Sequence, residues 1–144
     1  MDKKNKKRFV VSLSLLVFFI FILNTLAQKF YWYYSIWYFD MIMHFLGGLW
    51  LGLVFVWLFL VKKAVSQNIS SLVDLKLITK ILLGVLIIGV FWEIFEFIFN
   101  NILAGTSFDS LDTISDIFCD LTGGAFVIFY FLIKKAMLKK QDKV

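Results

Sequence analysis

Four apolar runs, each long enough to cross a lipid bilayer, constrain the fold of this chain more than any other feature. They cover about residues 9–27, 41–61, 81–99 and 115–133. A transmembrane helix needs about 20 apolar residues, and a backbone inside the bilayer must satisfy its own hydrogen bonds. None of the runs alternates apolar and polar residues as the strands of a barrel do. We therefore predict an all-α integral membrane protein, a four-helix transmembrane bundle in a single domain over residues 1–144.

Composition excludes a soluble domain. Apolar residues make up 61% of the chain, whereas soluble globular proteins contain about 45–50%. The net charge of +5 does not indicate a nucleic-acid partner, because the basic residues lie between the apolar runs and form no binding stripe. Membrane lipids are the partners that this composition predicts, and it leaves the oligomeric state open.

The basic residues also predict how the helices cross the membrane. Short loops rich in Lys and Arg stay in the cytoplasm. Of the 15 Lys and Arg residues, 14 lie before the first run, between the second and third, or after the fourth, and only Lys29 lies in the other connections. This distribution predicts an N-in/C-in topology, with both termini cytoplasmic.

The first run has two interpretations. It is a retained membrane span, or it is the apolar part of a signal peptide that is cut after Ala27. A run of about 19 residues exceeds the usual 7–15 of a signal peptide, which favours the retained span.

The stretch FYWYYSIWYFD, residues 30–40, follows on the predicted outer side. Trp and Tyr are enriched where the bilayer meets water. We interpret the stretch as an interfacial anchor that contains a short helix. A platform for a lipid head group or sugar is the alternative.

Two segments share one pattern of polar residues and glycines. FDMIMHFLGG (39–48) and SDIFCDLTGG (115–124) both read Asp, three residues, His or Asp, two residues, Gly-Gly. The predicted topology makes both segments enter the membrane in the same direction. The pattern predicts two parallel helical hairpins, with the second and fourth spans in contact at Gly47–Gly48 and Gly123–Gly124. Residues four apart share a helix face, so the facing polar residues would be Asp40, His44, Asp116 and Asp120.

The third run adds two carboxylates on one helix face, Glu93 and Glu96. At about 1.5 Å per residue, Glu93 lies about 20 Å from Lys80 in a core about 30 Å thick. We therefore expect three helices to bring their polar residues to one depth near the outer face. The first run contributes none and is expected to serve only packing.

Ionised groups inside a bilayer need protons or cations to offset their charge. Carboxylates with one imidazole suit a divalent metal cation such as Mn, Fe, Zn or Mg. A proton or sodium site is one alternative, and a polar plug that only fixes helix register is the other. Asp109 fits an N-cap, whereas Asp112 continues the spacing of Asp116 and Asp120. The predicted metal ligands are Asp40, His44, Glu93, Glu96, Asp112, Asp116 and Asp120.

These motifs resemble those of a known protein family. D-x-x-x-H-F-x-x-G, then E-x-x-E, then D-T-x-x-D-x-F-C over about residues 38–128 resembles the YjdF-like bacterial inner-membrane proteins, and more distantly the VanZ-like family. The resemblance implies a multi-pass protein of the prokaryotic inner membrane. VanZ-like chains differ in carrying Gln at the position of Glu96 and Asn at that of Asp120. YjdF-like chains carry a small residue at the position of Asp120.

Three functions fit this sequence. The first is a small membrane protein whose acidic cluster near the outer face binds a cation. The second is a metal-dependent enzyme that acts on a lipid head group or isoprenoid-linked envelope precursor, with Glu93 as the catalytic general base. The third is a passive assembly partner in a membrane complex.

Overall fold

The computed structural model describes residues 3–63, 74–103, 105 and 109–141. The described elements are all helical: α1 (Lys3–Lys29), α2 (Trp32–Ser35), α3 (Phe39–Lys63), α4 (Leu75–Phe97), the π-helix η2 (Ile98–Leu103) and α5 (Ser110–Gln141). Four of them contain stretches long and apolar enough to cross a membrane, at Lys6–Lys29, Phe39–Phe59, Leu75–Asn100 and Ser110–Met137. The prediction of an all-α protein with four such helices is therefore confirmed. Of the basic residues used to predict topology, Lys143 lies outside the described residues.

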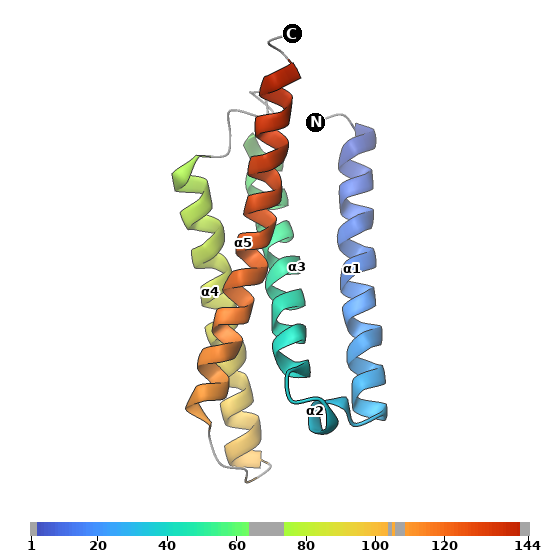
Figure 1. The fold of residues 1–144 in the computed structure, drawn as a ribbon, viewed down its shortest axis with the longest axis vertical. Helices are drawn as coiled ribbons and strands as arrows, with labels where there is room; N and C mark the ends of the chain where they lie inside the picture. Colours follow the sequence, from blue (N-terminus) through green and yellow to red (C-terminus); the bar gives the residue numbers. More distant parts are fainter. Residues whose placement is uncertain (1–2, 64–73, 104, 106–108, 142–144) are drawn as a thin grey trace.

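Three of the long helices pack together, and the first lies at their edge. Figure 1 shows α3, α4 and α5 gathered in one group, with α1 beside α3. Helices α3 and α5 run in the same direction, and α1 and α4 run in the opposite one. The indole Nε1 of Trp50 donates a hydrogen bond of 3.1 Å to the backbone oxygen of Leu13, which ties α3 to α1. Ala27, near the end of α1, is fully buried.

Glycines allow α3 and α5 to approach closely. A Cβ atom at Gly123 would lie 2.6 Å from the backbone nitrogen of Leu49, and one at Gly48 would lie 2.6 Å from the Cα of Asp120. A Cβ at Gly52 would lie 3.1 Å from the Cα of Gly124. The predicted glycine contact between the second and fourth spans is confirmed. The α3 glycines that lie against α5 are Gly48 and Gly52. A Cβ at the predicted Gly47 would make only an ordinary contact of 3.8 Å with the Asp120 side chain.

The half of the bundle away from α2 is held together by apolar side chains. Its buried members come from α3, α4 and α5: Val56, Leu77, Ile81, Val127 and Ile128. We call these five residues the apolar core. Val56 lies 12 residues after His44, which is about 18 Å along a helix. The apolar core and the start of α3 are thus well separated along the same three helices.

Local signals set where two of the helices begin. Asp74 precedes α4 and accepts a hydrogen bond of 2.8 Å from the backbone nitrogen of Leu77. Asp109 precedes α5 and accepts one of 2.9 Å from the backbone nitrogen of Leu111. The predicted N-cap role of Asp109 is confirmed. A short helix within the aromatic stretch, also predicted, is present as α2, and it follows Tyr31 with its left-handed φ of 58°.

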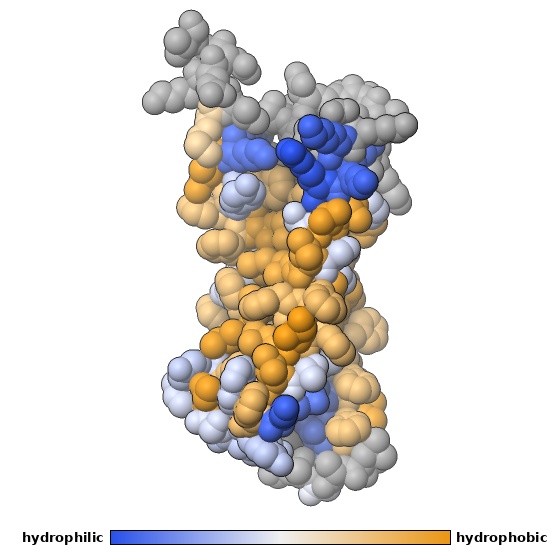
Figure 2. Space-filling model, turned by 90° about the vertical axis from the view of Figure 1, so that its right-hand side faces the viewer, coloured by the Kyte–Doolittle hydropathy of each residue, from blue (hydrophilic) through white to orange (hydrophobic). Residues whose placement is uncertain are grey.

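The surface has the hydropathy pattern of a membrane protein. The face in Figure 2 shows an apolar band across the middle and hydrophilic patches toward both ends. Large apolar side chains are exposed on α1, α4 and α5, among them Phe21, Phe91 and Phe129. Exposed apolar side chains over this length suit contact with lipid tails.

Candidate cation site

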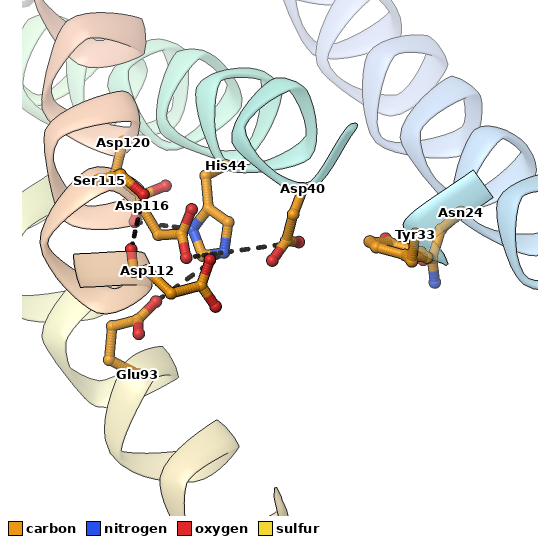
Figure 3. A network of polar contacts seen from close by, with 9 residues as sticks. All are labelled: Asn24, Tyr33, Asp40, His44, Glu93, Asp112, Ser115, Asp116 and Asp120. Carbon is orange, nitrogen blue, oxygen red and sulfur yellow. Dashed lines mark hydrogen bonds and ion pairs between the residues drawn. The ribbon is translucent and has the colours of Figure 1, made fainter. Parts of the chain in front are cut away.

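Helices α3, α4 and α5 bring six polar side chains together at one end of the bundle. We call Asp40, His44, Glu93, Glu96, Asp116 and Asp120 the acid–histidine cluster. Asp40 and His44 lie in the first turns of α3, the two glutamates near the end of α4, and the other two aspartates in the first half of α5. The expectation that three helices bring their polar residues together is therefore confirmed. Figure 3 shows these residues except Glu96.

His44 lies at the centre of the cluster. Its Nε2 atom lies close to one carboxylate oxygen from each of the three helices: 4.0 Å from Asp40 Oδ1, 3.8 Å from Glu93 Oε1 and 4.0 Å from Asp116 Oδ2. Only 6% of the imidazole side chain is exposed. The ring thus points one nitrogen into a space that carboxylates from three helices surround.

Asp120 contacts the other side of the imidazole. Its Oδ2 atom lies 3.5 Å from His44 Nδ1. Asp120 is 5% exposed, and it lies against Gly89 of α4, where a Cβ would be 2.6 Å from Oδ2. When a carboxylate accepts a hydrogen bond from Nδ1–H, the lone pair of Nε2 stays free for a ligand. Asp120 therefore orients the imidazole, whereas the other three carboxylates face its free nitrogen.

Several buried carboxylate oxygens of the cluster have no hydrogen-bond partner among the described residues. They are Glu93 Oε1 and both Asp116 oxygens. Glu93 is 8% exposed and Asp116 is 1% exposed, so water does not solvate them freely. Buried polar groups are almost always hydrogen-bonded in native proteins, and a buried charge without a partner is costly. The described residues thus supply no hydrogen bond to these oxygens, and a bound cation could satisfy them.

The distances fit a shared cation better than direct hydrogen bonds. The three contacts of 3.8–4.0 Å from Nε2 exceed the 2.7–3.2 Å of an N–H···O bond. Two ligands that are each about 2.0–2.2 Å from one metal ion lie at most about 4.4 Å apart. The same set of atoms can therefore surround one ion with little movement of the side chains.

Two groups of three residues have the spacing of metal ligands. In Asp40, His44 and Asp116, and in His44, Glu93 and Glu96, one ligand atom from each residue lies within 4.8 Å of the others. His44 belongs to both groups. The oxygens that surround it thus form two sets, one toward α5 and the start of α3, the other along α4.

Like Asp120, the predicted ligand Asp112 lies outside both groups. It is exposed on the first turn of α5, and Ser115 Oγ donates a hydrogen bond of 2.7 Å to its backbone oxygen. Its carboxylate still interacts through space with Asp40, Glu93 and Asp116. Asp112 is therefore a charge beside the cluster and not a member of either ligand group.

A polar pair near the cluster was not predicted from the sequence. The Tyr33 hydroxyl of α2 donates a hydrogen bond of 2.7 Å to Asn24 Oδ1 of α1. Burial first, and then the charges of Asp40 and Glu96, raise the pKa of Tyr33 to about 12. The pKa of Tyr33 thus depends on the charge of the cluster. The aromatic stretch before Asp40 contains no pattern that predicts this pair.

The comparisons with known proteins show the family of the chain. A family model described as "Predicted membrane protein (DUF2238)" matches residues 1–136. The chain belongs to this family. The match is compatible with the YjdF-like resemblance, and the VanZ-like resemblance stays a prediction. No curated protein and no solved structure matches the chain.

Proposed function

We propose that this membrane protein binds a divalent metal cation at Asp40, His44, Glu93 and Asp116, with Asp120 behind the imidazole. One observation carries the proposal. Carboxylate oxygens from three helices lie 3.8–4.0 Å from His44 Nε2, and those of Glu93 and Asp116 are buried and accept no hydrogen bond from the residues that the structure describes. A cation between these atoms would satisfy them all at once.

The donor set favours a transition metal. Imidazole with carboxylates suits Mn²⁺, Fe²⁺ or Zn²⁺, whereas Mg²⁺ prefers oxygen ligands and keeps much of its water. The thiol of Cys119 is absent from both ligand groups. We therefore rank Mn²⁺, Fe²⁺ and Zn²⁺ above Mg²⁺ as the ion that the cluster binds.

The two simpler alternatives explain the geometry less well. A polar plug that only fixed helix register would gain stability from direct hydrogen bonds, but three buried oxygens have none among the described residues. A site for protons alone would let a protonated carboxyl group donate to a neighbouring oxygen. Glu93 Oε1 and both Asp116 oxygens form no such bond with the described residues.

The electrostatics of the cluster favour binding of the cation itself over phosphate chemistry. In the described part of the chain, the basic partner in all four close contacts of the cluster's carboxylates is His44, and no Lys or Arg takes part in them. Enzymes that act on phosphate-bearing lipids commonly hold the phosphate with Arg or Lys. An anionic head group would meet several carboxylates here. A metal-dependent enzyme with Glu93 as general base is therefore our second hypothesis, and its substrate would reach the site only through the metal.

We further propose that the cluster lies near the outer face of a prokaryotic inner membrane. The 14-to-one distribution of basic residues supports cytoplasmic termini. The start of α1 and the end of α5 lie at the same end of the bundle, away from α2 (Figure 1). The shared direction of α3 and α5 supports an arrangement as two parallel helical hairpins. Reporter fusions after Val144 would give an external signal if this orientation were wrong.

Metal binding can be tested on the full-length protein in detergent or nanodiscs. The metal content after equilibration with Mn²⁺ or Zn²⁺ and removal of free ions would be compared between wild type, Asp116→Asn and Asp74→Asn. Asp74 caps α4 far from the cluster, and Asn also caps helices, so Asp74→Asn is a control for the loss of one carboxylate.

We expect wild type and Asp74→Asn to retain metal and Asp116→Asn to bind it at least about tenfold more weakly, since one ligand is lost. Metal at 100 times its Kd should also stabilise wild type by about 2.7 kcal/mol. Wild-type protein that retains neither ion and shows no thermal shift would overturn the proposal.

A further inference from the structure

The two ligand groups around His44 cannot both use the same nitrogen at the same time. The Nε2 lone pair binds one ion, and Nδ1 faces Asp120 at 3.5 Å. An ion held by Asp40, His44 and Asp116 therefore does not use Glu96 as a ligand. The second group then has two carboxylates, Glu93 and Glu96, that can ligate independently of the imidazole.

The charge of the cluster also exceeds what one divalent ion offsets. Its five carboxylates carry a formal charge of −5 with a neutral imidazole. One divalent cation lowers this to −3, and two lower it to −1. Excess charge in a membrane protein is costly, because low-dielectric surroundings strengthen repulsion between like charges. A second cation offsets most of the charge that the first leaves.

Glu93 is placed between the two groups. Its Oε1 atom lies 3.8 Å from His44 Nε2, is buried and has no hydrogen-bond partner within the described part of the chain. The residue also shares a ligand group with Glu96. A carboxylate has two oxygens and can ligate one ion with each. Two-metal sites hold their ions about 3.5–4 Å apart, which is a separation that one carboxylate spans. Helical bundles form such sites from acidic side chains on facing helices.

We infer that the acid–histidine cluster holds two divalent cations, with Glu93 as the bridging ligand and Glu96 as a ligand of the second ion alone. This inference rests on the proposed function, because the first ion is the one that Asp40, His44 and Asp116 bind. The second ion lies on the α4 side, where Glu96 is partly exposed and the ion can keep water ligands.

The number of ions bound to the full-length protein tests the inference. Wild type, Glu96→Gln and the control Asp74→Asn would be saturated with Mn²⁺, freed of unbound ions, and analysed for manganese and protein. The Mn²⁺ electron paramagnetic resonance spectrum of the wild type gives a second measurement that needs no variant, since two ions about 3.5–4 Å apart couple magnetically.

We expect about two Mn²⁺ per chain in wild type and Asp74→Asn, about one in Glu96→Gln, and a coupled spectrum that becomes that of an isolated ion in Glu96→Gln. About one ion per chain in wild type, with the spectrum of an isolated ion, would overturn the two-ion inference and leave the proposed function standing. Two ions in Glu96→Gln would overturn the role of Glu96. No bound Mn²⁺ or Zn²⁺ in wild type would overturn both proposals.

Discussion

The same three helices build two very different interiors. In the half away from α2, the apolar core buries Val56, Leu77, Ile81, Val127 and Ile128. In the other half, α3, α4 and α5 bury His44, Glu93, Asp116 and Asp120. Between the two halves, glycines bring the backbones of α3 and α5 together. One scaffold thus carries an interior of apolar side chains and an interior of buried carboxylates around one histidine.

The difference lies in what each interior requires. Apolar side chains need only close packing, which neighbouring helices supply. Carboxylates need partners, and at the acidic end the described residues supply one imidazole and leave three buried oxygens without a hydrogen bond. The apolar half therefore holds the fold together, and in our proposal the acidic half is built for a cation at a cost to stability.

The glycine contact between the two halves should give the largest effect. A side chain at Gly123 would overlap the backbone of α3, so Gly123→Leu should abolish the folded bundle. Ala136 is exposed on the same helix, and Ala136→Leu should leave the fold intact. Size-exclusion chromatography in detergent would report both. Monodisperse, folded Gly123→Leu protein would show that α3 and α5 do not cross here.

The two interiors should respond in opposite directions when metal is absent. Ile81 is 2% exposed in the apolar core, and Ile81→Ala should lower the free energy of unfolding by about 2–5 kcal/mol. Asp116→Asn removes a buried carboxylate that forms no hydrogen bond with the described residues, and it should leave metal-free protein at least as stable as wild type. Thermal unfolding with a chelator present measures both. A large loss of stability in Asp116→Asn would mean that Asp116 already has its partner.

Asp120 should affect metal binding without being a ligand. It faces Nδ1 of His44, and loss of such an orienting carboxylate typically lowers metal affinity by about 10–100-fold. Asp120→Asn should show a weakening of this size with the metal-free fold retained. Competition with a coloured chelator would give the affinity. Unchanged affinity would remove Asp120 from the site, and complete loss of binding would make it a ligand.

The smallest expected effect is on Tyr33, which lies beside the acidic half. Its pKa is raised to about 12, mainly by burial and partly by Asp40 and Glu96. The phenol therefore stays a donor to Asn24 up to about pH 11. The stability that it contributes is fully present below its ordinary pKa near 10 and is lost as pH rises through about 12.

Asp40→Asn should lower the pKa of Tyr33 partway toward 10, because burial remains when the charge is removed. The phenolate absorbance of wild type minus that of Tyr33→Phe would isolate this group, and Asp74→Asn should leave its pKa unchanged. An equal pKa in wild type and Asp40→Asn would show that Asp40 does not reach Tyr33.

The sequence predicted the acidic half well because its signals are local. The lengths of the apolar runs predicted four helices long enough to cross a membrane. The shared pattern of Asp, His or Asp, and Gly-Gly predicted that α3 and α5 are in contact. Spacing on a helix shows which residues share a face. Combined with depth, this was enough to bring His44 together with Glu93 and Asp116.

The side-chain contacts that could not be predicted from the sequence depend on how each helix is rotated against its neighbours. Spacing grouped Asp112, Asp116 and Asp120 alike, but in the structure the first is exposed, the second faces Nε2 and the third faces Nδ1. The bond from Tyr33 to Asn24 joins two helices across a turn whose geometry the aromatic sequence does not encode. Such relations follow from packing of whole helices and not from any one segment.

We propose above that a metal ion binds between His44 and the surrounding carboxylates. Zinc X-ray absorption spectroscopy tests it directly because the chain contains one histidine and one cysteine. With an affinity tag that lacks histidine, we expect nitrogen and oxygen ligands at about 2.0–2.2 Å, outer-shell scattering from one imidazole, and no sulfur. The imidazole signal should vanish in His44→Ala. A first shell that contains sulfur, or a wild-type spectrum without imidazole, would contradict the account.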